Sequence, residues 1–338
     1  MSESVRVGIV GGGLRGSMFA RVVEEHPAAE VVGFCEPSTQ VTERLTAAFS
    51  APVYRSTVDL LDSVEPDAVV IASPDFAHLE PGLACLDRGI DVLFEKPLST
   101  TAEDAHQLRK AAAASSSVVM IGYENRWNPK FRAVHQLLRA SSRPIVAQRV
   151  LLQNTTFVPR QMLRWAARST PGWFLFPHSL DMAMWLAGAR PVEVYARGVK
   201  RILSAAGVDT YDRIAASFLM SDGSILDLDS GWALPGARPS VFTFRHNVET
   251  AGEQFEIEID RTGVTRYDDS SISYVSMPET DQRGRLSGAP IDMMRDFIDL
   301  CRGEPLEVPG IDEGFQVTVA IAAVHESLQT NANTVIRY

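Results

Sequence analysis

A glycine-rich segment, Gly11–Gly16, constrains the fold more than any other part of the chain because of what lies on either side of it. A short apolar run, Val5–Val10, precedes the glycines, and Leu14–Glu25 follows with apolar residues at helical spacing. The segment fits the pattern G-x-G-x-x-G, which is weak alone but specific between a strand and a helix. The chain is therefore expected to begin with a strand–turn–helix unit of the kind that binds a dinucleotide.

Each glycine has a separate predicted task in such a unit. Gly11 allows the tight turn, Gly13 lets the backbone approach a pyrophosphate, and Gly16 permits close packing of the helix against the strand. Leu14 and Arg15 begin the helix, where free N–H groups and the positive end of the dipole attract phosphate. The alternative interpretation is a glycine-rich turn that holds no ligand.

Glu36 follows the second apolar run, Val31–Cys35, at the position where a carboxylate accepts hydrogen bonds from the ribose hydroxyls of NAD. The same charge repels the 2′-phosphate of NADP, so the sequence favours NAD over NADP. Arg15, Ser38 and Thr39 lie nearby and leave a phosphate site open. A solvated charge at a strand end is the structural alternative for Glu36.

Alternating elements continue through the first part of the chain. Continuous apolar runs predict strands covered on both faces, and helices between them predict a parallel, doubly wound sheet. The further strands are predicted at 31–35, 68–72, 92–94 and 118–121, and the further helices at 81–88 and 101–114, with Thr101 as an N-cap.

The second part has a different pattern. Several segments alternate apolar and polar residues, as Phe255, Ile257 and Ile259 do, which predicts a mostly antiparallel sheet with one packed face. Strands are predicted at 192–202, 211–220, 224–232, 240–246, 254–259 and 271–277, and helices at 129–139, near 159–167, and at 179–186, 293–301 and 313–330. We therefore predict an α/β protein with a Rossmann domain at 1–124 and an α+β domain at 125–338, and a late helix is a candidate for packing back on the first domain.

Composition and charge exclude several classes of protein. The 338 residues carry a formal net charge of −10, whereas a general binder of nucleic acid or anionic membranes needs a surplus of Lys and Arg. No apolar run reaches the roughly 18–20 residues of a membrane span, and the N-terminus lacks the features of a secretion signal. Cys35, Cys85 and Cys301 lie far apart, and no His, Cys, Asp or Glu spacing fits a metal site. We expect a cytoplasmic protein without a bound metal.

Short motifs downstream of the glycines resemble those of one oxidoreductase family. They are Ile71-Ala72-Ser73-Pro74, then His78, then Glu95-Lys96-Pro97-Leu98, Gly122-Tyr123 and Asn125-Arg126. Together they resemble the Gfo/Idh/MocA family of NAD(P)-dependent oxidoreductases, and the E-K-P tripeptide after a strand is the most specific of them. The resemblance implies a Rossmann domain followed by a mixed, mostly antiparallel sheet. It also implies a sugar, inositol or related polyol as substrate, and a homodimer or homotetramer built on the open face of the sheet.

Lys96 is the first candidate for chemistry. It follows a buried strand at its carboxyl end, where open α/β sheets place their ligands. The resemblance implies that Lys96 contacts the substrate and the nicotinamide ribose and assists proton transfer, and partial burial of a lysine lowers its pKa toward that task. The neighbouring Ser73, Pro74, His78 and Glu95 are assigned to the cofactor site, His78 as a support of the loop. A lysine that only pairs with Glu95 is the structural alternative.

His178 is the second candidate, and Asp181 lies three residues further on, one helical turn away. The aspartate could orient the imidazole. The pair resembles a substrate motif of the family, in which a histidine with an aspartate three residues on begins a helix. Many members carry another aspartate four residues before the histidine, where this chain has Phe174. Either Lys96 and His178 suffice in a more aromatic site, or the chemistry is altered or lost; a helix-start histidine with a dipole-favouring aspartate is the plain alternative.

Five more residues are candidates for substrate binding. Trp173 and Phe174 could form an apolar wall against a sugar ring or nicotinamide, or could pack in the core. Tyr123, Asn125 and Arg126 fall at the predicted junction of the domains, where Asn125 and Arg126 could donate hydrogen bonds to substrate hydroxyls or join the domains together.

The leading hypothesis is therefore a dehydrogenase or reductase that exchanges hydride between NAD and a CH–OH carbon of a polyol. Lys96, assisted by His178, removes or returns the hydroxyl proton in this hypothesis. Two alternatives use the same scaffold. One is an NAD-bound sensor without turnover, which the aromatic residue at position 174 motivates, and the other is glycoside cleavage assisted by NAD.

Overall fold

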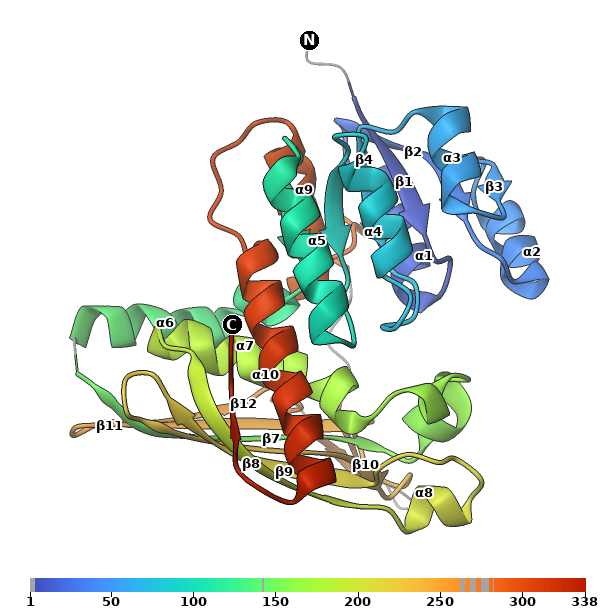
Figure 1. Cartoon of the computed structure of the whole chain (residues 1–338). Coiled ribbons are helices and arrows are strands. Elements are labelled where there is room, and N and C mark those ends of the chain that lie inside the picture. The colour runs from blue at the N-terminus through green and yellow to red at the C-terminus, as the bar shows by residue number, and fades with distance from the viewer. Residues whose placement is uncertain (1–3, 142, 262–264, 268–271, 275–279, 282) are drawn as a thin grey trace. The chain divides into compact units, whose positions relative to one another are not determined.

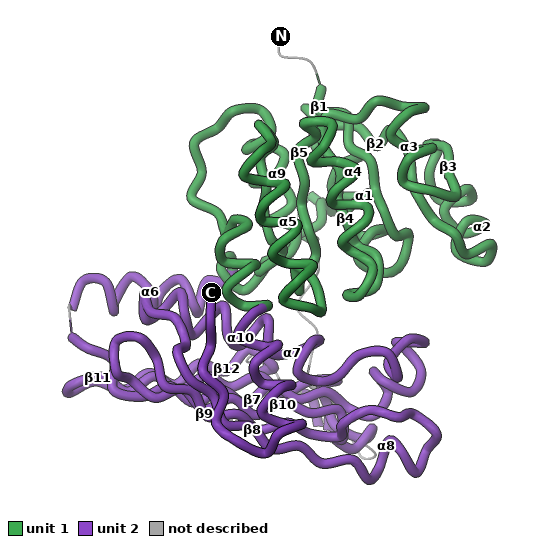
Figure 2. Tube along the Cα trace, viewed as in Figure 1, with its two compact units in different colours: residues 1–127, 279–318 green, residues 128–278, 319–338 purple. Residues whose placement is uncertain are grey.

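The structure is a computed structural model of the chain and describes residues 4–141, 143–261, 265–267, 272–274, 280–281 and 283–338. It divides into two compact units, which are coloured separately in Figure 2. The first unit contains residues 1–127 and 279–318, and the second contains residues 128–278 and 319–338. The C-terminal helix α10 (Ile311–Thr330) begins in the first unit and ends in the second.

The first unit is built on a six-stranded sheet in the order β3-β2-β1-β4-β5-β6, in which every neighbouring pair is parallel. The central strands consist of apolar residues that are buried almost throughout, as expected for strands covered on both faces. The strands are β1 (Val5–Val10), β2 (Ala29–Cys35), β3 (Val53–Tyr54), β4 (Ala68–Ile71), β5 (Asp91–Phe94) and β6 (Val119–Ile121).

Helices from two distant parts of the sequence pack in this unit. Met294 and Phe297 of α9 share one buried apolar cluster with Phe19 and Val23 of α1, although more than 260 residues separate the two helices along the chain. The helices are α1 (Leu14–Glu25), α2 (Thr39–Ala48), α3 (Thr57–Val64), α4 (Leu79–Leu86), α5 (Ala102–Ala114) and α9 (Ala289–Cys301), and a 3₁₀ turn, η1, covers Glu124–Trp127.

The strand order reverses direction between β1 and β4, which lie side by side at the centre of the sheet. In an open parallel sheet such a reversal leaves a crevice at the carboxyl ends of the two strands, because the connections leave in opposite directions. The sheet therefore has one edge at which a ligand site is expected, and the loops after β2, β1, β4, β5 and β6 all emerge there.

The second unit is built on a seven-stranded sheet in the order β12-β11-β7-β10-β9-β8-β15. β7 and β10 are parallel, and the other described pairs are antiparallel. Residues of β9 alternate between exposed and buried from Arg213 to Met220, so one face packs and the other does not. The strands are β7 (Ile145–Thr155), β8 (Pro191–Val199), β9 (Arg213–Met220), β10 (Ile225–Leu234), β11 (Phe242–Thr250), β12 (Gln254–Glu258) and β15 (Thr334–Val335), with β13 (Thr265–Tyr267) and β14 (Ile272–Tyr274) as a separate pair.

Two helices, α6 (Pro129–Ser141) and α7 (Pro171–Ala187), pack against one face of this sheet (Figure 1). A short helix, α8 (Ile202–Ala205), follows β8. The opposite face carries charged side chains, among them Arg149, Arg245 and Asp227, around a shallow hollow of about 560 Å³.

The predicted fold class is confirmed: a parallel doubly wound sheet is followed by a mixed, mostly antiparallel one. The first strand and the first helix have the predicted bounds. The predicted cap of α5 is also present, because the Thr101 hydroxyl accepts a hydrogen bond from the Asp104 N–H at 3.0 Å.

The sequence pattern did not predict β3, β7, β15, α2 or α3. β7 is the most consequential of these, since it lies at the centre of the second sheet. Its last four residues, Leu152, Gln153, Asn154 and Thr155, are all buried, and three of them are polar. The strand therefore shows neither clean alternation nor a continuous apolar run. The strand predicted at 271–277 lies largely outside the described residues, which include only Ile272–Tyr274 of it.

Two predicted helices of the second unit were wrong in detail. The segment near 159–167 is a π-helical turn at Val158–Met162 followed by a 3₁₀ turn at Ala166–Arg168, because Leu163 leaves the helical region at ψ 91°. Helix α7 begins eight residues before the predicted start, because Thr170 caps it and Pro171 occupies its first position.

Among the helices of the described residues, none combines the length and apolar composition needed to cross a bilayer. The same part of the chain contains no group of His, Cys, Asp and Glu that could hold a metal ion.

His246 of β11 is a fully buried histidine in the second unit. Its Nε2 lies 2.9 Å from Oε1 of Gln148, whose own amide donates to the Ala183 carbonyl of α7 at 3.0 Å. The Phe131 ring of α6 packs edge-on against the imidazole at 5.8 Å. Desolvation by burial lowers the pKa of His246 to about 3, so the ring is neutral in the folded protein.

We expect His246 to make the second unit sensitive to mild acid. An unfolded histidine titrates near 6.5 and the folded one near 3, so this residue's contribution to stability is complete above about pH 6.5. It is then lost at up to about 1.4 kcal/mol per pH unit as the pH falls toward 3. Urea unfolding followed by tryptophan fluorescence tests this, because four of the five tryptophans lie in the second unit.

The matched comparison is His246→Gln, which is uncharged at every pH, with His106→Gln on the exposed surface of α5 as the control. The stability advantage of the unmodified protein over His246→Gln should shrink between pH 7 and pH 5, while the control shows no such trend. Parallel pH curves for the unmodified protein and His246→Gln would contradict a neutral buried imidazole.

Candidate functional site

The glycine loop between β1 and α1 is packed so closely that two of its glycines cannot be replaced without strain. Gly11 has a φ of +93°, and a Cβ there would lie 2.6 Å from the Ser73 backbone nitrogen. A Cβ on Gly16 would lie 1.9 Å from the Gly11 carbonyl oxygen. Gly13 differs, because a Cβ there meets no atom within 4 Å, so the loop backbone is open on that side.

The N-terminus of α1 follows directly at Leu14, with Gly13 as its N-cap. The first N–H groups of a helix have no partner inside the helix, and Gly13 has no side chain that could cap them. Leu14 is 72% exposed, so its side chain does not cover this end of the helix. Open backbone at Gly13 beside uncapped helical N–H groups is a suitable place for the phosphates of a dinucleotide.

Glu36 closes the loop from the neighbouring strand β2. Its Oε2 accepts a hydrogen bond from the Gly12 N–H at 2.9 Å, and its Oε1 accepts one from the Ser38 N–H at 2.8 Å. The residue is 8% exposed, so it is not the solvated charge that the structural alternative required. Each carboxylate oxygen has a second lone pair, so Glu36 can still accept from a ribose hydroxyl.

The loop after β4 is tied to the segment after β5 by a buried histidine. His78 is 1% exposed, with Nδ1 2.8 Å from the Pro97 carbonyl and Nε2 3.1 Å from the Ser73 carbonyl. Ser73 donates its hydroxyl to the Ala77 carbonyl at 3.0 Å, while Pro74 beside it is partly exposed. The contacts of His78 are those of a residue that supports the two loops.

Glu95 and Lys96 emerge together at the end of β5. The Lys96 N–H donates to Oε2 of Glu95 at 3.1 Å, and the Lys96–Pro97 peptide is cis. Glu95 is buried and Lys96 is partly exposed. Desolvation lowers the pKa of the Lys96 amine, although the nearby carboxylates of Glu95 and Glu124 act in the opposite direction.

Arg15 has different contacts from those expected of a phosphate ligand. Its Nε lies 2.6 Å from Oε1 of Glu95, and its Nη2 pairs with Oε2 of Glu124 in η1. Burial alone would lower the pKa of this guanidinium, but the two carboxylates outweigh the desolvation and raise it. Arg15 therefore joins the start of α1 to the ends of β5 and β6.

The residues after β6 differ strongly in exposure. Tyr123 and Asn125 are 1% and 7% exposed, so both are buried, while Arg126 is partly exposed. With the loops described above, they place the predicted site residues of the first unit behind five neighbouring strands, in the spatial order β2, β1, β4, β5 and β6.

In the second unit, the predicted residues lie on α7 and its first turn. His178 and Asp181 are in the middle of this helix, so the interpretation of His178 as a helix-start residue was wrong. Asp181 is 1% exposed, and His178, one turn earlier, is partly exposed.

The start of α7 is fixed by a histidine from α10. Nε2 of His325 lies 2.7 Å from the Thr170 hydroxyl, and its Nδ1 lies 2.8 Å from the Ile321 carbonyl. The Trp173 ring stacks on the same imidazole at 4.8 Å and is 8% exposed. Trp173 is therefore packed in the second unit and presents little surface to a ligand.

Phe174 is more accessible and belongs to an aromatic cluster. Its ring contacts Trp165 and Trp232 edge-on, with centroids 6.1 and 5.7 Å away. Phe174 and Trp165 are partly exposed, whereas Trp232 of β10 is completely buried. The sequence pattern singled out neither tryptophan, because their proximity to Phe174 exists only in the folded unit.

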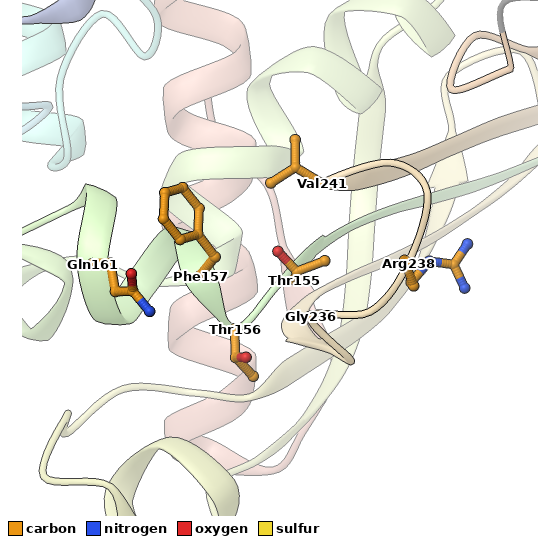
Figure 3. A pocket seen from close by; sticks show the side chains of 7 residues that line it. All are labelled: Thr155, Thr156, Phe157, Gln161, Gly236, Arg238 and Val241. Atoms are coloured by element: carbon orange, nitrogen blue, oxygen red, sulfur yellow. The ribbon is translucent and has the colours of Figure 1, made fainter. Parts of the chain in front are cut away.

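A hollow of about 450 Å³ lies at the end of β7 in the second unit (Figure 3). Its lining is mixed: Thr155, Thr156 and Gln161 supply polar groups, and Phe157 and Val241 supply apolar ones. The sequence pattern assigned none of these residues to a site; Thr155 ends the strand β7, which it did not predict, and Val241 lies in the strand predicted at 240–246. None of the predicted substrate residues lines this hollow.

Comparison with known proteins agrees with this arrangement of the first unit. Residues 5–123 match the family model GFO_IDH_MocA, which is described as an oxidoreductase family with an NAD-binding Rossmann fold. An inositol 2-dehydrogenase of Rubrobacter xylanophilus is 25% identical over 340 residues, which cover 98% of this chain and 93% of the relative. A scyllo-inositol 2-dehydrogenase (NADP(+)) of Bacillus subtilis is 25% identical over 218 residues, covering 62% of this chain and 59% of the relative.

Solved structures show the same fold over the whole chain. The scyllo-inositol dehydrogenase of Lactobacillus casei with bound NAD(H) and scyllo-inositol superposes with a TM-score of 0.84 at 19% identity, covering 98% of this chain and 99% of that one. The glycine loop, the carboxylate after β2 and the E-K-P segment after β5 all lie within residues 5–123. This part of the chain matches the NAD-binding Rossmann unit of the Gfo/Idh/MocA oxidoreductases, the family that its motifs resemble.

Proposed function

We propose that the chain is an NAD-dependent dehydrogenase or reductase that acts on a CH–OH carbon of a cyclitol or sugar derivative. The observation that carries the proposal is the arrangement of Gly13, Glu36 and Lys96 behind three strands of one parallel sheet. These residues offer a phosphate cradle, a ribose acceptor and an amine of lowered pKa at a single sheet edge.

The residues at this edge fit a dinucleotide. Open backbone at Gly13 and the N-terminus of α1 would hold the pyrophosphate, and Glu36 would hold the ribose next to the adenine. The negative charge of Glu36 favours NAD, because the 2′-phosphate of NADP would meet a carboxylate there. Arg15 is paired with Glu95 and Glu124, which reduces its availability to a 2′-phosphate.

When bound, NAD supplies the hydride acceptor or donor, and the chain's own residues handle the proton. A neutral Lys96 amine accepts the proton of the substrate hydroxyl as the carbon is oxidised, and the protonated amine returns it in the reverse direction. Burial lowers the pKa of Lys96 and so increases the neutral fraction near physiological pH. In the second unit, the almost fully buried Asp181 of α7 would orient the His178 imidazole one turn away.

The substrate class is proposed from the names of the relatives and from the aromatic cluster around Phe174. The relatives named above act on inositols, which are cyclic polyols. Rings of Phe174 and Trp165 offer apolar surface to the C–H face of a cyclic polyol, whereas an aspartate at position 174 would offer a hydrogen bond. We therefore propose a cyclitol or sugar with one less polar face as the substrate.

We also propose that the uncovered face of the second sheet joins subunits into a homodimer or homotetramer. Leu219 and Ile225 lie opposite each other on this face and are 46% and 51% exposed. Exposed apolar residues beside paired charges are typical of a protein interface.

The glycine loop yields a matched pair of variants. Gly16→Ala should destabilise the protein by about 1–3 kcal/mol or more, because the new Cβ collides with the Gly11 carbonyl. Gly13→Ala should cost less than about 1 kcal/mol, the range for alanine in place of glycine at an N-cap. It should nevertheless weaken NADH binding by about tenfold, equivalent to 1.4 kcal/mol, because its methyl group occupies the side open to the pyrophosphate.

Thermal unfolding of the ligand-free protein and fluorescence titration with NADH separate the two effects. If Gly13→Ala binds NADH as tightly as the unmodified protein, the loop is not the pyrophosphate site.

The charge of Glu36 should set the preference between the two cofactors. Glu36→Gln retains a hydrogen-bond acceptor and removes the charge. A charge-assisted hydrogen bond exceeds a neutral one by about 1 kcal/mol, so the ratio of Kd for NADPH to Kd for NADH should fall about fivefold. Glu43→Gln, on the exposed surface of α2, is the control. An unchanged ratio in Glu36→Gln would remove this residue from the cofactor site.

Loss of Lys96 should abolish most of the turnover while cofactor binding persists. Lys96→Met should lower kcat about 10²- to 10⁴-fold, the range for general acid–base catalysis, and leave the Kd for NADH within a few fold. Lys110→Met on α5 serves as the control, since Lys110 is exposed. The assay is NADH production from NAD and a panel of inositols and glycosides.

The same panel separates the alternatives. Binding of NADH and of a polyol by the unmodified protein without turnover would indicate a sensor. Release of free sugar from a glycoside without net NADH would indicate a glycosidase. Full activity in Lys96→Met would overturn the assigned proton transfer.

A further inference from the structure

We propose that Arg15 is a positioning residue for the reaction: by holding the carboxylates of Glu95 and Glu124, it keeps the Lys96 amine from being locked in its protonated form. The inference rests on the proposed function of Lys96 and extends it to a residue of the glycine loop, which the sequence pattern assigns to the phosphates.

The geometry of the pair is specific. The Arg15 Nε lies 2.6 Å from Oε1 of Glu95, and its Nη2 pairs with Oε2 of Glu124. The other Glu95 oxygen, Oε2, accepts the backbone N–H of Lys96 at 3.1 Å. One guanidinium therefore holds two carboxylates, and one of these is anchored to the lysine's own backbone.

The three side chains of these ion pairs are all at least partly withdrawn from solvent. The Glu95 and Glu124 side chains are 8% and 21% exposed, and that of Arg15 is 33% exposed. Charges in such surroundings are screened much less than on the surface, so removing one charge alters the protonation of its neighbours. An arginine suits this task because it stays charged at every relevant pH and binds two acceptors with separate N–H groups.

The charges around Lys96 come from four elements. Glu95 follows β5, Glu124 lies in η1, Arg15 begins α1, and Asp75 follows β4. Three of these groups are acidic and favour the ammonium form, whereas Arg15 opposes it. Without Arg15, Lys96 would be the remaining cation among three carboxylates, and its pKa would rise away from the range in which it accepts a proton.

The glycine loop explains why this arginine reaches the strand ends. Gly16 allows α1 to start against the Gly11 carbonyl, and Arg15 is the residue immediately before Gly16. The loop that cradles the cofactor phosphates thus also delivers a cation to the pair Glu95 and Glu124. In this proposal, the turn Gly11–Gly16 contributes both to cofactor binding and to the pKa of the Lys96 amine.

The test measures the Lys96 pKa without any substrate. The chain has four lysines, Lys96, Lys110, Lys130 and Lys200, so protein grown with ¹³C-lysine gives four side-chain Cε signals that can be followed by NMR during a pH titration. Lys96→Met assigns the signal of interest by its disappearance.

Two substitutions should move the Lys96 pKa in opposite directions. Arg15→Gln should raise the Lys96 pKa, because two carboxylates lose their counterion. Glu124→Gln should lower it further, because one carboxylate disappears. Arg109→Gln breaks an ion pair of the same length with Asp312 elsewhere on the first unit, and should leave the Lys96 signal unchanged.

The outcomes are distinct from those of the proposed function. An unchanged Lys96 pKa in Arg15→Gln would overturn the inference, and weaker NADH binding at that unchanged pKa would make Arg15 a cofactor ligand instead. Opposite shifts in Arg15→Gln and Glu124→Gln would support it even if no polyol were turned over. If turnover is found, the acidic limb of the plot of kcat against pH should move to higher pH in Arg15→Gln. A loss of folded protein alone would lower kcat without moving this limb. Should Arg15→Gln fold poorly, Arg15→Met replaces it, with the same rise of the Lys96 pKa expected and an unchanged pKa again overturning the inference.

Discussion

The contact between the Gly16 backbone and the Gly11 carbonyl is the constraint on which the rest of the first unit depends. Because Gly16 has no side chain, α1 can start directly against the Gly11 carbonyl at the end of β1. That start directs the helix N-terminus at the reversal of strand order between β1 and β4, where an open parallel sheet has its crevice. It also places Gly12 so that its N–H donates a hydrogen bond to the Glu36 carboxylate after the neighbouring strand β2. The proposed phosphate cradle and the proposed ribose acceptor both depend on the absence of a Cβ at Gly16.

The carboxylates at this edge of the sheet are stabilised in two different ways. Glu36 is satisfied by backbone N–H groups, so its charge is stabilised without a cation and remains effective toward a ligand. Glu95 and Glu124 are paired with a guanidinium instead, which cancels one of their two negative charges beside the amine of Lys96. Carboxylates only a few strands apart thus have different environments. In the proposed function, Glu36 selects the cofactor, whereas Glu95 and Glu124 influence the proton acceptor.

Much of this could be predicted from the sequence where the signal is local. Val5–Val10, the glycines and Leu14–Glu25 follow one another along the chain, and the predicted bounds are those observed. The E-K-P tripeptide likewise directed attention to the end of β5. Contacts between residues far apart in the chain could not be predicted, and the ion pair between Arg15 and Glu124 spans 109 positions. β7 was missed because its polar residues are buried on both faces, a property of its central place in the sheet and not of its own sequence.

The composition of the first unit has a consequence for how the protein is made. Helix α9 supplies Ile291, Met294 and Phe297 to the apolar cluster that also contains Phe19 of α1. A ribosome delivers the N-terminal residues long before α9, so the growing chain carries an incomplete core while residues 128–278 of the second unit are synthesised. An N-terminal fragment that ends after η1 lacks these side chains, so the apolar surface that α9 covers would be exposed to solvent. A segment near the opposite end of the chain therefore completes the core of the Rossmann unit.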